Sequence, residues 1–234
     1  IRERAQAMID IAHPDDRPRL VERAKEAKLL YKDQIFLAES GHLYPETLAR
    51  AEVFKGGLKV HFRPIKPSDE DEMRRLFYRF SDQAVYYRYF ARIKTMPHGK
   101  MQEYVNVDYR RVMSIVGIVQ EKGIDRIIAE GRYVRLPDRP YADTAFLVDE
   151  AYQGKGISTY LLNLLIRIAR EQGGIEGFRA DVLLDNKSML RVFEKTPFPL
   201  RAVVSEGAYE IVIAFRDKHE PEEIKRLEEE KRTK

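Results

Sequence analysis

The chain of 234 residues contains no cysteine. It can therefore form no disulfide and cannot use a thiolate as a nucleophile or metal ligand. No apolar run reaches the roughly 18 residues that a membrane span requires, and no stretch has the pattern of a signal peptide. We expect a cytoplasmic protein in a reducing compartment, without membrane contact.

An excess of one charge is also lacking. The 42 lysines and arginines stand against 38 acidic residues, which are mixed with them along the chain and leave a net charge of +4. This even mixture is not the basic stripe of a nucleic-acid-binding protein, so no nucleic acid partner is expected. The five histidines do not have the spacing of metal ligands, and no metal site is predicted: His13, His42, His61, His98 and His219.

The first 55 residues are predicted to be helical, with helices over 1–12, 15–30 and 44–54. An apolar stripe includes Ala5, Met8, Ile9 and Ala12, but burial of a few such side chains cannot offset the entropy of ordering tens of residues. These helices should therefore be ordered only by docking on another part of the protein. The pair Gly56-Gly57 predicts a boundary with a domain over 58–216, and residues 217–234 form a charged tail.

The domain after this boundary mixes strands and helices. Ser68 is expected to cap a helix that buries Met73, Leu76, Phe77 and Phe80. Strands are predicted over 58–65, 112–120, 126–135, 142–148, 177–184, 201–206 and 208–215, and helices over 98–106, 159–174 and 187–195. Several strands follow one another without an intervening helix. The fold class predicted is therefore α+β, with a mostly antiparallel mixed sheet flanked by helices, rather than a doubly wound parallel sheet.

The stretch "FLVDEAYQGKGIS", residues 146–158, lies between a predicted strand and a predicted helix. Gly154 and Gly156 remove side chains where a ligand must approach the backbone. The start of a helix has free N–H groups and the positive end of the helix dipole. The loop is therefore predicted to bind an anion, most often a phosphate.

Three kinds of phosphate loop can be compared with it. The dinucleotide fingerprint G-x-G-x-x-G would need a third glycine where Thr159 stands, and the nucleotide P-loop needs a different glycine spacing. The third kind has Gln or Arg, two residues, Gly, one residue, then Gly or Ala. Gln153, Gly156 and Ser158 resemble this acyl-CoA loop of the GNAT acetyltransferases, with serine as a departure in the last place.

The order of elements around the loop strengthens this resemblance. The strand "TAFLV", the loop, the helix "TYLLNLLIRIA", the strand "FRADVLL", Asn186 and the helix "SMLRVFEK" follow one another as they do in that superfamily. Residues 58–216 are similar to the bacterial branch that includes protein-lysine acetyltransferases. The resemblance implies acetyl-CoA as donor and an amine, most often a protein lysine, as acceptor. It implies that acetyl-CoA contacts Leu147, Val148, Gln153, Gly154, Lys155, Gly156, Ile157, Ser158, Thr159 and Asn186.

Two acids are candidates for the general base that this reaction needs. In the related enzymes a glutamate lies ten residues before the Gln or Arg of the loop, and Asp143 occupies that place here; Glu130 is the other candidate. Many members of the superfamily have a tyrosine seven residues after the asparagine to protonate the leaving thiolate, whereas this chain has Phe193. Enzymatic transfer to a lysine, transfer to a small amine, and acetyl-CoA sensing without transfer therefore remain open.

Two further stretches leave alternatives. Residues 4–25, with the segment "IAHPDD", are similar to the C-terminal end of acetyl-CoA hydrolases and CoA-transferases. That resemblance implies an upstream transferase domain in a longer chain as a partner, and the alternative is a plain helical cap. The cluster "YYRYF", residues 86–90, either lines the acceptor site with Arg88 or packs its aromatic rings in the core.

Overall fold

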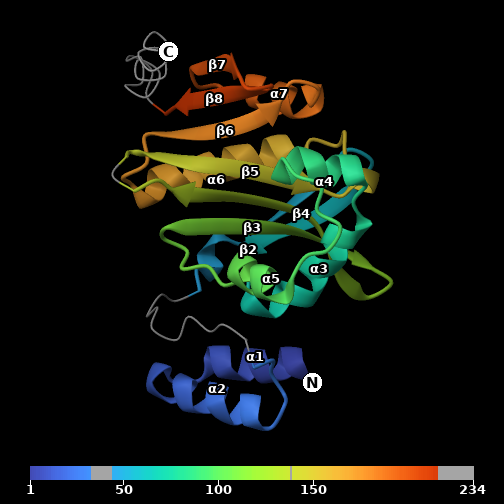
Figure 1. The fold of residues 1–234 in the computed structure, drawn as a ribbon, viewed down its shortest axis with the longest axis vertical. Coiled ribbons are helices and arrows are strands. Elements are labelled where there is room, and N and C mark those ends of the chain that lie inside the picture. Colours follow the sequence, from blue (N-terminus) through green and yellow to red (C-terminus); the bar gives the residue numbers. More distant parts are fainter. Residues whose placement is uncertain (33–43, 138, 216–234) are drawn as a thin grey trace.

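The computed structural model describes residues 1–32, 44–137 and 139–215, and its strands form one sheet in the order β1-β2-β3-β4-β5-β6-β8-β7 (Figure 1). Neighbouring strands are antiparallel except β5 and β6, which are parallel. This is the mixed, mostly antiparallel sheet that the sequence predicted. The strands are β1 (Arg50–Phe54), β2 (Leu58–Pro64), β3 (Val112–Glu121), β4 (Ile124–Arg135), β5 (Tyr141–Val148), β6 (Gly177–Leu183), β7 (Leu200–Ser205) and β8 (Ala208–Ala214).

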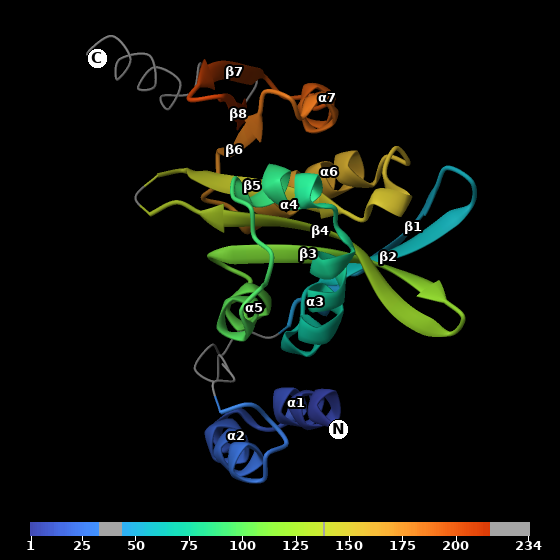
Figure 2. The same cartoon turned by 45° about the vertical axis from the view of Figure 1, so that its right-hand side comes forward.

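Helices cover both faces of this sheet. One face carries α3 (Glu70–Arg79), α4 (Asp82–Tyr89) and α5 (His98–Val105), and the other carries α6 (Ile157–Gln172) with α7 (Lys187–Glu194) beside it (Figure 2). Side chains of alternate strand residues meet the two helix layers, because successive residues of a strand point to opposite faces. On β5, Leu147 packs with the α3 and α5 core, whereas Phe146 and Val148 pack with the α6 core.

Helix α6 forms where the apolar periodicity predicted it, directly after the glycine loop. Leu161, Leu162, Leu165, Ile166 and Ile168 are all buried, and at roughly 1.5 to 3 kcal/mol each they stabilise the seat of the helix on the sheet. The rigid helix and the strand before it hold the loop at both of its ends.

The buried face of α3 is also as predicted for Met73, Leu76 and Phe77. Its cap is not. Ser68 makes no capping hydrogen bond, and the carboxylate of Asp69 accepts instead from the N–H of Lys66 at 2.7 Å. The carboxylate of Asp69 also accepts from both terminal nitrogens of Arg63. A charged carboxylate therefore holds the start of this helix with more hydrogen bonds than a serine hydroxyl could accept.

The prediction of a helix over 44–54 is wrong. A single 3-10 turn at Glu46–Leu48 is followed by β1, which pairs along its whole length with β2. Gly56 and Gly57 adopt left-handed backbone angles, with φ of +81° and +75°, and turn the chain between the two strands. Pairing with a neighbouring strand overrides local helix propensity here. The sheet therefore begins at Arg50, before the glycine pair that we expected to separate the domains.

The N-terminal helices α1 (Arg2–Ile11) and α2 (Arg17–Glu26) lie at the end of the molecule where α3 and α5 are found (Figure 1). Ile9, Val21, Ala24 and Leu30 form a small core of their own. Met8 does not share in it, because its side chain is 65% exposed, so the predicted apolar stripe is wrong at that position.

These helices contact the sheet domain through few groups. Arg2 donates twice to the carboxylate of Asp71 on α3, at 2.6 and 2.8 Å, and its guanidinium lies over the ring of Tyr31. Tyr31 in turn meets His98 of α5 edge to face, with ring centroids 4.2 Å apart. The contact between these helices and the sheet domain is thus polar and aromatic. The predicted charged tail lies outside the described residues.

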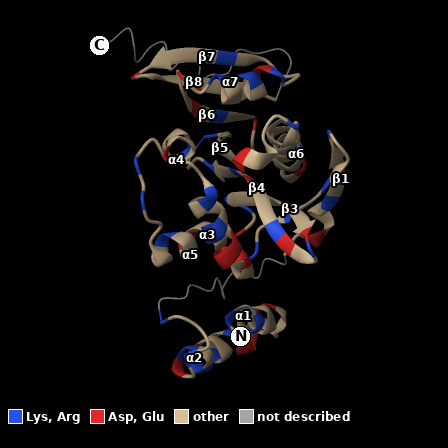
Figure 3. Ribbon diagram, turned by 90° about the vertical axis from the view of Figure 1, so that its right-hand side faces the viewer, with Lys and Arg blue, Asp and Glu red and all other residues tan. Residues whose placement is uncertain are grey.

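Within the described residues, none of the helices combines the length and the apolar character needed to cross a bilayer. Basic and acidic residues are interspersed along the ribbon (Figure 3).

Candidate active site

The parallel strands β5 and β6 are paired near their N-terminal ends and then diverge. They pair only over Tyr141–Gly177, Ala142–Phe178 and Asp143–Arg179. Beyond these pairs a cavity of about 650 Å³ opens between them. Two strands line it, β5 with residues 143–148 and β6 with Ala180, Asp181 and Val182. The glycine loop contributes Gln153, Gly154 and Gly156, and the start of α6 contributes Ile157, Ser158 and Thr159. The other lining residues come from α4 (Gln83, Ala84, Tyr87 and Arg88), from α7 (Ser188, Met189, Val192 and Phe193), and from helix ends at Phe90 and Asn186.

The glycine loop presents a row of free donors at one end of this cavity. Gly154 and Gly156 have φ of +71° and +96°, which a residue with a side chain rarely adopts. The first intrahelical bond of α6 is from the N–H of Tyr160 to the carbonyl of Gly156. Across the part of the chain that the structure describes, no acceptor meets the N–H groups of residues 154–159. Such a row at a helix N-terminus is suited to a phosphate group.

Lys155 and Gln153 complete the loop in different ways. Gln153 turns its amide back and donates from Nε2 to the carbonyl of Val148 at 3.1 Å, which ties the loop to the end of β5. Lys155 is half-buried beside the donor row and adds a positive charge to it. Every predicted loop residue from Gln153 to Thr159 therefore lies at the strand-to-helix turn where the sequence placed it.

The open edge of β5 exposes backbone groups to the cavity. The N–H of Asp149 bonds to the carbonyl of Ile128 on β4 at 2.7 Å, and successive strand residues direct their backbone groups to opposite edges. Leu147, paired with Glu130, therefore turns its backbone toward β4, while Phe146 and Val148 turn theirs toward the cavity. Sequence reasoning named Leu147 and missed Phe146, because the edge of the sheet that stays open depends on where β6 separates.

Asp149 holds the turn after β5 in place. Its carboxylate accepts from Arg79 of α3 at 2.9 Å, from Arg126 at 3.4 Å and from the N–H of Ala151 at 3.1 Å. This buried acid thus anchors the start of the loop to α3 and β4 and does not line the cavity.

Glu130 is fully buried, at 0% exposure, and does not line the cavity. It accepts from Ser114 at 2.6 Å, Arg132 at 2.7 Å and the hydroxyl of Tyr104 at 2.8 Å. Burial works to raise its pKa, but Arg132 and Arg88 outweigh burial, so the pKa of Glu130 lies below its usual range. A carboxylate with three donors and a lowered pKa is a poor proton acceptor. The geometry therefore does not favour the base role that the sequence left open for Glu130.

Asp143 lines the cavity and is exposed to it. It lies on the face of β5 that also carries Leu147, toward α4. Across the opening, Asp181 of β6 lines the same cavity. Partial burial raises the pKa of Asp181, Arg179 opposes this, and Glu210 adds to it. Sequence reasoning missed Asp181, since nothing in "FRADVLL" shows that this acid lines the same cavity as Asp143.

Asn186 caps α7. Its Oδ1 accepts from the N–H of Met189 at 3.2 Å and from the hydroxyl of Ser188 at 3.0 Å, and the residue lines the cavity. Phe193, about two turns further along this helix, is 1% exposed and meets Phe146 edge to face with ring centroids 6.0 Å apart. A phenyl ring in this place can shape the cavity but cannot donate a proton.

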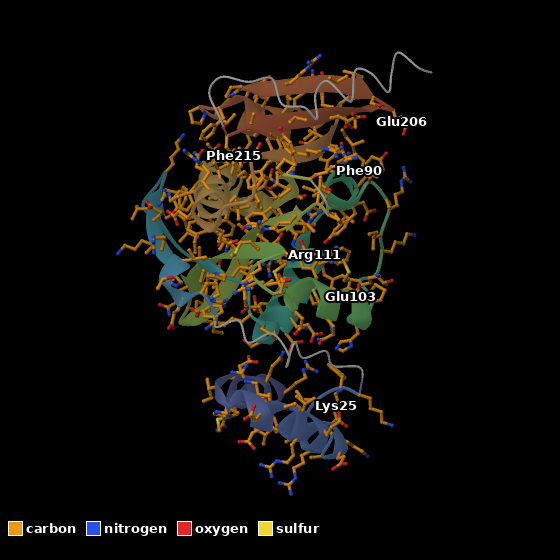
Figure 4. The ribbon with its side chains drawn as sticks, turned by 90° about the vertical axis from the view of Figure 1, so that its left-hand side faces the viewer. Lys25, Phe90, Glu103, Arg111, Glu206 and Phe215 are labelled. Atoms are coloured by element: carbon orange, nitrogen blue, oxygen red, sulfur yellow. The ribbon has the colours of Figure 1, made fainter. Side chains whose placement is uncertain are left out.

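Helix α4 forms the wall of the cavity opposite α6, and its aromatic cluster is divided, because Tyr89 meets the buried Phe77 with ring centroids 6.0 Å apart. Only Val85 of this helix is buried, while Tyr87, Arg88 and Phe90 line the cavity. Phe90 lies at the C-terminal end of α4, on the same side of the sheet as Glu103 of α5 and opposite Phe215 (Figure 4). The mixture of aromatic and basic letters was the only signal for this wall, and it did not distinguish a core stripe from a site.

No group of three or more potential metal-binding side chains occurs among the described residues.

Comparisons with known proteins agree with this geometry. Residues 70–198 match the family described as the acetyltransferase (GNAT) family. Over 150 residues the chain is 25% identical to an acetyltransferase of Pseudomonas aeruginosa, which covers 64% of this chain and 77% of the relative. Over 136 residues it is 29% identical to acetyltransferase Pat of Mycolicibacterium smegmatis, covering 58% of this chain and 40% of that one.

A solved structure supports the same assignment. The GNAT domain of S. lividans PAT superposes with a TM-score of 0.67 at 26% identity, covering 74% of this chain and 99% of that domain. The chain thus spans nearly all of an isolated domain but well under half of the length of the mycobacterial relative.

Proposed function

The chain belongs to the acetyltransferase (GNAT) family, and we propose that it transfers an acetyl group from acetyl-CoA to an amine, with a protein lysine as acceptor. The observation that carries this proposal is the row of unpartnered N–H groups of residues 154–159, set at the mouth of the cavity between β5 and β6. An anionic head bound there would direct the rest of a long ligand into that cavity.

Acetyl-CoA suits both parts of this site. Its pyrophosphate is an acceptor for the donor row and for the charge of Lys155. Its pantetheine arm carries amides that need backbone partners, and the open edge of β5 provides them at Phe146 and Val148. The neighbouring residues Gln153 and Asn186 hold the loop and α7 in the positions that keep this opening in place.

The transfer itself needs a neutral amine, whereas lysine has a pKa near 10.4 and is mostly protonated at neutral pH. In the reaction proposed, the carboxylate of Asp143 takes a proton from the ammonium group. The amine nitrogen then forms a bond to the thioester carbonyl carbon, the C–S bond breaks, and the nitrogen gives its extra proton to water as the amide forms. The place of Asp143 on the cavity wall supports this role. Positioning of the amine next to the thioester supplies much of the rate.

The leaving thiolate takes up a proton from water in this scheme, because Phe193 has none to give. A thiolate with a conjugate pKa near 8.5 is a fairly good leaving group, so the reaction does not require a tyrosine. The buried phenyl ring at 193 is also the observation that favours a second candidate, an acetyl-CoA sensor without transfer activity.

The acceptor class is supported by the sequence resemblance to protein-lysine acetyltransferases and by the aromatic wall of α4, against which the aliphatic stem of a lysine could lie. A small amine is the alternative acceptor. We further propose, on the resemblance of the segment around "IAHPDD", that the N-terminal segment before β1 is the end of an acetyl-CoA hydrolase or transferase region, which meets the acetyltransferase domain through Arg2 and Asp71.

Calorimetry with CoA and radiolabelled acetyl-CoA on a cell lysate test these proposals together. We expect CoA binding in the micromolar range and labelled protein bands that depend on the enzyme. Absence of CoA binding at millimolar ligand contradicts the whole proposal. Binding with neither labelled protein nor labelled small amines supports the sensor, and labelled small amines alone support the small-molecule acceptor.

A further inference from the structure

Arg88 lies on the cavity wall with most of its hydrogen-bonding capacity unused. One Nη2 donates to the hydroxyl of Tyr104 at 3.1 Å. An arginine has five N–H donors, and within the described residues no other donor of Arg88 has an acceptor. Its Nε is buried from solvent without a partner. A buried donor left unpaired is unfavourable by about 1 to 3 kcal/mol, so Arg88 retains donors that a bound group could satisfy.

The charges around Arg88 do not cancel. Arg132 lies over the ring of Tyr104 at 3.5 Å and donates to Glu130, whose two oxygens are already occupied by Arg132, Ser114 and Tyr104. Glu130 therefore balances one of two neighbouring guanidinium groups. The remaining positive charge belongs to the group that lines the cavity, which is Arg88.

The neighbours of Arg88 on α4 add an apolar frame. Tyr87 and Phe90 also line the cavity, and Phe90 is 43% exposed with a left-handed φ of +56°. A bulky side chain in that conformation is unusual and is a recognised mark of functional sites. The wall thus combines two aromatic rings with one cation that shares its carboxylate counter-charge with Arg132.

The position of Arg88 separates it from the loop that holds the anionic head of the donor. Residues 154–159 lie at the start of α6, which covers one face of the sheet, whereas α4 covers the other face. The cation of Arg88 is therefore on the side from which an acceptor, rather than the donor pyrophosphate, reaches the end of β5.

We propose that Arg88 binds a carboxylate of the acceptor, next to the amine that is acetylated. This inference rests on the proposed function, and it makes Arg88 a specificity-determining residue. Planar guanidinium and carboxylate groups match each other in paired hydrogen bonds. The carboxylate could come from an acidic side chain flanking an acceptor lysine or from the α-carboxylate of a free amino acid, and both offer Arg88 the same chemistry.

Two matched acceptor pairs distinguish these sources on the unmutated protein. The first is a peptide whose acceptor lysine is flanked by Glu and the same peptide with Gln. The second is free lysine and lysinamide. We expect kcat/KM to favour the carboxylate member of one pair by about 10- to 100-fold, as for a charge-assisted hydrogen bond. Preference in the first pair assigns an acidic peptide, and preference in the second assigns an amino acid.

The variant Arg88→Gln should abolish that preference, and Arg88→Lys should retain part of it because the charge remains. Arg92→Gln, an exposed arginine just beyond α4, is the matched control and should keep the full preference. Equal kcat/KM within both pairs on the unmutated protein overturns the inference, as does a full preference in Arg88→Gln.

Calorimetry of the same acceptor pairs with the CoA-saturated protein measures their affinities directly, so this test does not depend on turnover. If no product forms with any acceptor, the transfer function is wrong. Tighter binding of a carboxylate member that is lost in Arg88→Gln then still supports the carboxylate site. Equal affinities within both pairs refute it, whether or not product forms.

Discussion

The two walls of the cavity are built in different ways. The wall at α6 consists of one continuous stretch, residues 153–159, and offers mainly backbone N–H groups. The wall at α4 is supported by side chains from α4, α5, β3 and β4, namely Arg88, Tyr104, Ser114, Glu130 and Arg132. Backbone N–H groups can bind the pyrophosphate, which every acyl-CoA donor shares. Side chains that meet only in the folded protein can instead be matched to one acceptor substrate.

This difference teaches how the two walls should fail. A substitution in the α6 wall should abolish binding of the acetyl-CoA donor and leave the fold intact, because the loop contributes few packing contacts. Damage to the network behind the α4 wall should first weaken the fold, because its charges are buried. Four substitutions test this contrast, in order of the effect expected.

The largest effect is expected for Gly156→Glu at the α6 wall. A side chain and a negative charge would stand among the N–H groups offered to the pyrophosphate, so the Kd for CoA should rise more than about 1,000-fold, or about 4 kcal/mol. Calorimetry measures this directly. The matched control is Gly123→Glu in the β3–β4 turn, which has a similar φ of +79° and equally open space for a Cβ. If both variants lose binding alike, backbone strain rather than the site explains the loss.

The next effect concerns Glu130→Gln behind the α4 wall. Loss of the carboxylate leaves two buried guanidinium groups without a counter-charge, and the free energy of unfolding should fall by about 3 kcal/mol. Urea unfolding of both forms measures it. Glu103→Gln removes a solvent-exposed pair with Lys100 and should change stability by less than about 1 kcal/mol. A Glu130 variant as stable as the Glu103 variant would show that the network is not needed.

The same carboxylate has a pH signature. Because the folded-state pKa of Glu130 is lowered below the ordinary 4.5, its contribution is present above that value and is lost as pH falls through the folded pKa. Acid unfolding of the unmutated protein should therefore converge with that of Glu130→Gln at the lowest pH.

A smaller effect is expected for Asp143→Asn, which changes chemistry without changing either wall. If Asp143 is the base, kcat should fall about 100-fold while the Kd for CoA stays the same. Steady-state kinetics with a lysine peptide measure it. Asp125→Asn, at the exposed start of β4, serves as the control. Equal rates for the unmutated and Asp143→Asn forms would remove Asp143 from the mechanism, and Asp181→Asn would then be the next variant to assay.

The smallest effect is expected far from both walls, at Asp10 of α1. Burial raises the pKa of this carboxyl to about 6 from 3.8, although Arg17 and Lys66 oppose it. A raised folded-state pKa means that the folded protein binds the proton more tightly, so stability falls as pH rises from 3.8 to about 6. At neutral pH, Asp10→Asn should therefore raise the free energy of unfolding by less than about 1 kcal/mol, which thermal unfolding detects as a slightly higher Tm. Below pH 3.8 the substitution should not change stability.

The exposed Asp15→Asn is the control for this change. The same pH dependence in the Asp15 and Asp10 variants would show that another group titrates in this range.

Local pattern was sufficient for most of the fold. Helix α6, the strands on either side of it and the hairpin around Gly207 appear where periodicity and turn residues predicted them, because amphipathic spacing decides which side of an element is buried. The error at residues 44–54 has the opposite cause. Strand β1 is almost wholly exposed, so it has no buried stripe to mark it, and only its pairing with β2 makes it a strand.

The sequence by itself determined the donor wall of this protein, since glycines, helix start and free N–H groups all lie within residues 153–159 and depend on no distant partner. It could not determine which acids and cations face the cavity. Glu130 and Asp143 are both acids on strands, yet one is enclosed by three donors and the other lines the opening. Only the tertiary structure decided this, because the environment of a charge depends on residues that are distant in sequence and adjacent in space.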